Sequence, residues 1–233
     1  MQALIDEYVA SAHPVGSSTL VRRHLAGVSS ATVRNELMWL EGRGYVTSPH
    51  TSSGRVPTNV GYRSFVNSLL LSHGFLQAFR ANSPHGILLH HVAPEGADQL
   101  QNIANMLVFL SEHVGCLAVM WAPAISQSVT HRGLAALMSQ PEFRETAAAL
   151  PLIQLLENYG ELVALLREVL EISGLHIRIG TENADSQLYS FSMVASRVDI
   201  DAHSAVVAVF GPTRMDYRKA IASVSAVVDG YKH

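Results

Sequence analysis

The most informative segment of the N-terminal part is SSATVRNELMWLEGRGYVTSPHTSSGRVPT, residues 29–58. Its first half has the spacing of a helix, which Ser29 or Ser30 can cap and Gly44 can end. Its second half has the composition of two short strands joined by a turn, and Pro57 closes the second strand because proline cannot donate to a ladder. A shorter Ser-rich helix precedes the stretch. This order of elements predicts a winged helix-turn-helix, a fold that places one helix in a DNA major groove.

The longer of the two helices has two chemically different sides. At about 100° per residue, Val33, Leu37 and Leu40 fall on one narrow stripe, which we expect to face a small core. The residue types on the opposite side suit base edges, since arginine binds guanine, asparagine binds adenine and alanine contacts a thymine methyl. Taken alone, the helix is equally typical of a solvated surface helix, and that alternative stays open. The residues of the two helices that we predict to contact DNA are Ser17, Ser18, Ser29, Ser30, Ala31, Thr32, Arg34 and Asn35.

The predicted hairpin offers a second contact with DNA. Arg55 stands at the base of the hairpin, and His50 and Thr51 stand in its loop. Their hydrogen-bond donors can reach phosphates or a minor groove. The alternative is a solvated hairpin in which Arg55 pairs with Glu41 instead of DNA.

Charge is divided unevenly along the chain. Residues 1–80 hold seven arginines and four acidic residues, a net charge of +3, whereas residues 81–233 hold nine basic and fifteen acidic residues, a net charge of −6. The first part therefore attracts phosphate and the rest repels it, as expected of a discrete DNA-binding domain joined to a partner-binding or sensing domain. The overall balance of 16 basic against 19 acidic residues argues against a protein that coats nucleic acid with its whole surface.

Recognisable motifs are spread over most of the chain. They are PVGS at 14–17, VSSATVRN at 28–35, PHTSSGRVPT at 49–58, GYR at 61–63, QPEF at 140–143, RIG at 178–180 and GPTRMDY at 211–217. In this order they resemble a known family, the HrcA heat-inducible transcription repressors.

The resemblance implies a homodimeric repressor that binds double-stranded DNA at the CIRCE inverted repeat. Its targets would be heat-shock chaperone operons of the grpE-dnaK-dnaJ and groES-groEL type, with repression relieved on heat stress. The resemblance also implies that the GroE chaperonin modulates the repressor by helping to keep it active.

The chain departs from the family pattern in two places. The family carries a long segment between the strand that resembles residues 114–122 and the segment that resembles residues 133–143, and here only residues 123–132 span that gap. In the family, the missing segment supplies part of the second domain's sheet and an inserted dimerising domain. Most members also extend upstream of Met1, which predicts a clipped first helix over residues 2–12 or a misassigned start.

Without that insertion, the dimer surface must lie elsewhere. The first choice is the apolar face of a long helix predicted over residues 58–79, at Tyr62, Phe65 and Leu69, because its stripe is wider than packing on a small winged domain needs. Two alternatives stay open: this stripe is the seam between the two domains, or the C-terminal sheet domain carries the dimer contact.

The chain as a whole predicts an α+β fold, with the N-terminal winged helix-turn-helix followed by a sheet domain that the resemblance makes GAF-like. We predict a DNA-binding domain with a long trailing helix over residues 1–80, a linker over 81–96, and a regulatory and dimerisation domain over 97–233. The predicted helices of the second domain are 98–112, 142–156, 160–173 and 216–231, and its predicted strands are 114–121, 175–180, 188–199 and 203–210.

Residue types that carry catalysis or bind metals do not form a recognisable site. His90 and His91 are adjacent and so point apart in regular structure, and no Cys/His pairs of the zinc type occur. Neither a nucleophile elbow, nor paired acids, nor a phosphate loop is present, so we predict no enzyme, no metal and no cofactor. Arg214, in the turn GPTR, forms either a structural pair or part of an anion-binding nest. Two other functions stay open: a small-molecule-sensing winged-helix regulator that uses the GAF-like domain, and a hydrolase or transferase with an incidental winged helix.

The cellular compartment that we expect follows from three sequence patterns that the chain does not have: paired cysteines, a signal peptide and a membrane span. The single cysteine, Cys116, stands in an apolar stretch and is predicted to be a small core residue, so no disulfide framework is possible. The N-terminus does not have the pattern of a signal peptide, and no segment has about 18 consecutive apolar residues. We therefore expect a cytoplasmic protein with no membrane partner.

Overall fold

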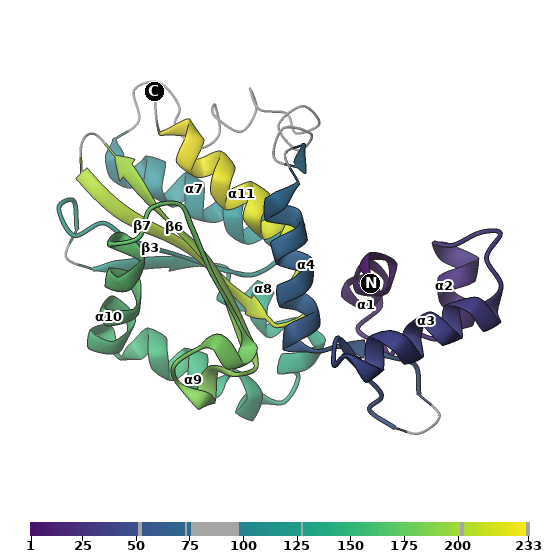
Figure 1. Ribbon diagram of the computed structural model, residues 1–233. Coiled ribbons are helices and arrows are strands. Elements are labelled where there is room, and N and C mark those ends of the chain that lie inside the picture. Colours follow the sequence, from purple (N-terminus) through teal and green to yellow (C-terminus); the bar gives the residue numbers. More distant parts are fainter. Residues whose placement is uncertain (51–52, 73, 76–97, 127, 201–202, 232–233) are drawn as a thin grey trace. The chain divides into compact units, whose positions relative to one another are not determined.

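The computed structural model describes all residues except 51–52, 73, 76–97, 127, 201–202 and 232–233 (Figure 1). The chain forms two compact units, residues 1–72 and residues 73–233. Both helices and strands are present, so the prediction of a mixed α+β fold is confirmed. The linker predicted over residues 81–96 lies outside the described residues.

The first unit consists of helices and one short hairpin. Its elements are α1 (Gln2–Ser11), α2 (Ser17–Arg23), α3 (Ser30–Gly42), β1 (Val46–Thr47), β2 (Val56–Pro57) and α4 (Asn59–Leu71). The two strands are antiparallel, with Val46 opposite Pro57 and Thr47 opposite Val56. The predicted apolar stripe of α3 enters the core, which also takes residues from α1, α2 and β1. The buried residues of this core are Leu4, Val15, Leu20, Val33, Leu37 and Val46.

Helix α4 is shorter than predicted. It begins at Asn59, where the Thr58 side chain caps it by accepting a hydrogen bond from the Gly61 amide, and it ends at Leu71. The backbone of Ser72 is extended, and both its amide and its hydroxyl donate to the Leu69 carbonyl. These hydrogen bonds to the Leu69 carbonyl compete with the backbone hydrogen bonds that would continue the helix. The prediction of one helix over residues 58–79 was therefore wrong.

The second unit contains a sheet and the remaining helices. Its elements are α7 (Gln99–Val114), β3 (Leu117–Trp121), β4 (Val129–Arg132), α8 (Leu134–Met138), η1 (Pro141–Phe143), α9 (Thr146–Glu157), α10 (Tyr159–Leu170), β5 (Leu175–Ile179), η2 (Gly180–Glu182), η3 (Ser186–Leu188), β6 (Phe191–Ile200), β7 (His203–Pro212) and α11 (Tyr217–Gly230). The five strands are antiparallel in the order β4-β3-β7-β6-β5. Helices α9 and α10 cover one face of the sheet, and α7 and α11 cover the other (Figure 1).

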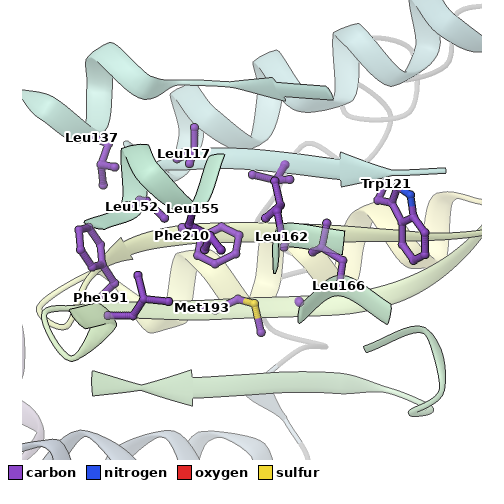
Figure 2. Close-up of a cluster of buried hydrophobic side chains, with 14 of the residues drawn as sticks. Leu117, Trp121, Leu137, Leu152, Leu155, Leu162, Leu166, Phe191, Met193 and Phe210 are labelled. Carbon is purple, nitrogen blue, oxygen red and sulfur yellow. The ribbon is translucent and has the colours of Figure 1, made fainter. Parts of the chain in front are cut away.

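Alternate residues of β3, β6 and β7 form the core under α9 and α10 (Figure 2). On β7, Val206, Ala208 and Phe210 belong to this core, while Val207 and Val209 are buried on the opposite face. Successive side chains of a strand point to opposite faces, so a strand covered on both sides is a continuous apolar run. The strand predicted over residues 203–210 is confirmed as β7, which extends to Pro212.

The strand predicted over residues 114–121 begins later than expected. Helix α7 continues to Val114, and Gly115 ends it in the left-handed conformation with φ of 70°. Glycine adopts this conformation at little cost, which makes it a common helix stop. The strand therefore begins only at Leu117, and the predicted start was wrong.

Two elements near the missing family segment also differ from prediction. Strand β4 lies in the stretch 123–132, where none was predicted, because its four residues Val-Thr-His-Arg have too little apolar pattern to be found alone. The helix predicted from residue 142 begins only at Thr146. Before it, the Phe143 amide donates to the Gln140 carbonyl three residues back, as in a 3₁₀ turn.

Two of the family motifs meet around Arg214. The Nε of its guanidinium lies 2.5 Å from Oε1 of Glu142, and one Nη donates to Oε2 of Glu142 at 3.1 Å and to the Gln140 amide oxygen at 3.0 Å. The Arg214 side chain is only 9% exposed. Of the two roles considered for Arg214, the structural pair is the one observed.

Cys116 lies between α7 and β3 and is buried, as predicted. Burial disfavours the thiolate and raises the pKa of this thiol from its usual 9.0 to about 12. We therefore expect no reaction with a thiol reagent at pH 8 in the folded protein and complete reaction in denaturant. Rapid labelling of the folded protein would contradict the burial of this thiol.

The raised pKa of Cys116 also makes stability depend on pH. Because the folded state holds the thiol proton more tightly than the unfolded state, the Cys116 contribution to stability should be lost as pH rises from 9.0 to about 12.

Within the described part of the chain, no single helix is long and apolar enough to cross a membrane. The pair Ala147–Glu157 and Tyr159–Leu170 meets the length and composition test only when the two are taken together, and it bends by 82° at the break.

Candidate nucleic-acid interface

Helix α3 has one buried side and one exposed side, as its sequence predicts. Val33 and Leu37 are buried, with 4% and 6% of their surface exposed. Its first turn is capped by Ser29, whose side-chain oxygen accepts a hydrogen bond from the Thr32 amide at 3.0 Å. Of the two serines considered as the cap, Ser29 is the one observed. The exposed residues on the predicted DNA-contacting side are Ser30, Ala31, Thr32, Arg34, Asn35 and Met38.

The beginnings of α2 and α3 are joined by a side-chain hydrogen bond. The hydroxyl oxygens of Ser17 and Ser30 lie 2.9 Å apart, although thirteen positions separate them in the sequence. Ser18, the next residue of α2, is exposed. Three of the predicted contact residues are thus brought to one place on the surface.

In the hairpin, Arg55 has an internal partner. Its guanidinium lies 2.8 Å from the Glu41 carboxylate on α3, so the alternative in which Arg55 pairs with Glu41 is the one observed. The backbone of Arg55 is held as well, because its amide and carbonyl form two hydrogen bonds with Val15, at 2.8 and 2.9 Å. His50 is exposed, and its amide donates to the Ser53 hydroxyl. Thr51 lies outside the described residues.

A polar cleft of about 370 Å³ lies between α2, α3 and the hairpin. It is open to solvent and combines two arginines with serine hydroxyls and glycine backbone. Sequence reasoning missed this cleft as a unit, because its walls come from three separate stretches. The lining residues are Val15, Gly16, Ser17, Ser18, Arg34, Leu37, Ser53, Gly54 and Arg55.

Gly54 is the residue that allows one wall of the cleft to close. A Cβ at this position would lie 2.4 Å from the carbonyl carbon of Val15, which is far below contact distance. Only glycine lets the hairpin approach the backbone before α2 this closely. The Ser-rich turn in the sequence predicts a loop at Gly54 but does not reveal this contact.

Some of the arginines of the first unit already interact with other residues of the unit, and others are exposed to solvent. Arg23 pairs with the buried Glu7 at 2.8 Å, and the Arg43 guanidinium stacks 4.0 Å above the Trp39 ring. Arg22 and Arg34 are exposed, and neither forms an ion pair with another residue in the described ranges. These two side chains are therefore ready to meet an anionic surface.

The residues predicted to form a dimer contact are buried within the single chain. Tyr62, Phe65 and Leu69 have 2%, 6% and 9% of their surface exposed, whereas Leu70 and Leu71 have 47% and 76%. A side chain that is already buried offers little surface to a second chain. The large apolar side chains that α4 leaves exposed are thus Val60 near its start, with 58% of its surface exposed, and Leu70 and Leu71 at its end, and not the three predicted positions.

Metal-binding residue types do not cluster in the parts of the chain that the structure describes. Among these residues, no three His, Cys, Asp or Glu side chains are placed to hold an ion. His90 and His91 lie outside the described residues.

Comparison with known proteins assigns the chain to a family. The family model described as "HrcA protein C terminal domain" matches residues 72–221. The chain belongs to the HrcA family. This match covers most of the second unit, and the relatives below extend the similarity to the first.

Several relatives of this chain carry the name heat-inducible transcription repressor HrcA. One from Brevibacillus brevis is 26% identical, and the alignment covers 99% of this chain and 94% of the relative. One from Pseudarthrobacter chlorophenolicus is 38% identical over 161 residues, which is 69% of this chain and 43% of the relative. One from Nocardia farcinica is 58% identical over 69 residues, which is 30% of this chain and 20% of the relative.

The alignment with the Brevibacillus brevis relative also bears on chain length. It runs over 323 positions, although this chain has only 233 residues. The relative therefore has residues at many positions where this chain has none, in keeping with a short form of the family.

A solved structure shares the fold. A crystal structure described as a hypothetical protein at 2.2 Å resolution superposes with a TM-score of 0.79 and covers 97% of this chain and 94% of its own. Its sequence identity is 15%, so the likeness concerns the fold alone.

Proposed function

We propose that this chain is a repressor of heat-shock genes that binds the CIRCE inverted repeat upstream of chaperone operons of the grpE-dnaK-dnaJ and groES-groEL type. Family membership and the names of its relatives support the regulatory role. The observation that carries DNA binding is the two-sided α3, with Val33 and Leu37 buried and Arg34 and Asn35 exposed. Repression is relieved on heat stress, and the GroE chaperonin modulates the protein by helping to keep it active.

We infer that the first unit is a winged helix-turn-helix, with α3 as the helix that enters the major groove and β1–β2 as the wing. The Ser17–Ser30 hydrogen bond supports this inference, since it joins the two helices at the end where DNA would approach. In this arrangement Asn35 reads a base edge, and the exposed Arg22 and Arg34, which form no ion pair with the residues that the structure describes, are available to phosphates.

We infer that the protein acts as a homodimer, because an inverted repeat is read by two recognition helices related by a two-fold axis. The second unit, with its five-stranded antiparallel sheet and helices on both faces, supports the GAF-like domain that the family resemblance implies. A dimer contact at Tyr62, Phe65 and Leu69 stays a prediction, and the exposed Leu70 and Leu71 are better placed for it on α4.

A footprint of the purified full chain on the DNA upstream of its own chaperone genes tests the proposal. We expect protection of both halves of an inverted repeat, and light scattering of the same sample should give the mass of two chains. If the dimer neutralises about six phosphates, the logarithm of the binding constant should fall with the logarithm of salt concentration with a slope near −5.

The matched control for this experiment is the same duplex with one half-site scrambled. Because one recognition helix then loses its base contacts, affinity should fall toward that for random DNA. Equal affinity for the intact and scrambled repeats would contradict sequence-specific repression.

A further inference from the structure

The ion pair between Glu41 and Arg55 stands next to the proposed DNA site. Arg55 lines the cleft, and its guanidinium lies 2.8 Å from the Glu41 carboxylate. The two side chains are 22% and 34% exposed, so water and ions reach the pair. Two backbone hydrogen bonds to Val15 fix the Arg55 backbone, which leaves the side chain as the part that can change partners.

The cleft has the chemistry of a site for one phosphate. Two of its lining residues, Arg34 and Arg55, are cations, Ser17 and Ser18 are hydroxyl donors, and none of the described residues that line it is acidic. Arginine and hydroxyl groups are the usual hydrogen-bond donors to a phosphodiester. Glu41, which is outside the lining, supplies the anion that Arg55 would otherwise lack.

We propose that Glu41 restrains Arg55 in the free protein, and that a DNA backbone phosphate entering the cleft replaces Glu41 as the partner of this guanidinium. The inference rests on the proposed function, since it requires the cleft to face DNA. A partly exposed ion pair is weak, so the exchange is feasible, and a phosphate brings a fixed charge to the same donor.

The exchange reduces what Arg55 contributes to DNA binding. Once the phosphate has taken its place, the Glu41 carboxylate remains nearby without its partner and offsets one positive charge. Glu41 therefore limits affinity for the DNA backbone. Since a phosphate contact carries no sequence information, it limits binding to operator and to random DNA alike.

Glu41→Gln in the full chain tests this role, because it keeps the shape of the side chain and removes its charge. We expect tighter binding to both DNAs by the same factor, and a salt slope steeper by about 0.9 per subunit. That change corresponds to about 3-fold more loss of affinity per subunit between 50 and 200 mM salt.

Glu36→Gln is the matched control, since Glu36 is exposed on the same helix and does not line the cleft. It removes the same charge, and we expect it to leave the slope nearly unchanged. Equal effects of the two substitutions would overturn the proposal, because the gain would then come from net charge alone.

A second test asks whether the effect of Glu41 passes through Arg55. In a chain that carries Arg55→Gln, adding Glu41→Gln should change binding no more than adding Glu36→Gln does. A Glu41 effect that persists without Arg55 would overturn the proposal. Failure of the proposed function has a different signature: the wild-type chain would bind operator and random DNA equally well. In that case the salt slopes measured on random DNA would still decide the role of Glu41.

Discussion

Replacing Asn35 with alanine is expected to weaken operator binding by about 1–3 kcal/mol at each half-site and to leave binding to random DNA nearly unchanged. Asn35 is exposed on α3, on the side opposite the buried Val33 and Leu37. An asparagine in this position can form two hydrogen bonds with one adenine, and a dimer on an inverted repeat makes the contact twice. Binding curves on operator and random duplexes, recorded at one salt concentration, give both quantities.

Gln2→Ala is the matched control for this experiment, since it truncates another exposed amide of the first unit, on α1. It should change neither affinity. Equal losses on operator and random DNA for Asn35→Ala would show that this side of α3 contacts the backbone and does not read bases.

Replacing Phe191 with alanine is expected to lower the free energy of unfolding of the second unit by about 3–5 kcal/mol. Phe191 is 1% exposed and stacks on Phe143, with ring centroids 4.9 Å apart and an interplanar angle of 10°. The substitution removes a ring from the core under α9 and α10 and leaves a cavity that the surrounding side chains fill only in part. Denaturant unfolding, followed by tryptophan fluorescence, measures the loss.

The chain offers a reporter and a control for that measurement. Trp121 belongs to the same core as Phe191, so in a Trp39→Phe background the fluorescence follows the second unit alone. Tyr189→Ala removes an aromatic ring that is 42% exposed, and it should cost no more than about 0.5 kcal/mol. A Phe191→Ala loss as small as that of Tyr189→Ala would mean that the Phe143–Phe191 stack does not stabilise the core.

Much of the fold follows from short-range patterns in the sequence. The spacing of Val33 and Leu37 marks the buried side of α3, and Ser29 begins the helix through a bond to an amide three residues away. The continuous apolar run of β7 marks a strand covered on both faces. The predicted end of a helix was wrong where one local hydrogen bond stops the helix, as at Ser72. A strand was missed where its own residues give little pattern and pairing with a neighbouring strand holds it, as in β4 beside β3.

The family, the α+β fold and the exposed side of α3 can all be predicted from the sequence, because each of them depends on residue types at fixed spacing. The partner of Arg55 and the cleft that this side chain lines emerge only from the three-dimensional arrangement. Both arise where stretches distant in the sequence meet: Val15 and Gly54 come into backbone contact, and Glu41 approaches the hairpin from α3. A spacing rule cannot predict such meetings, because they depend on how the packed core brings separate elements together in space.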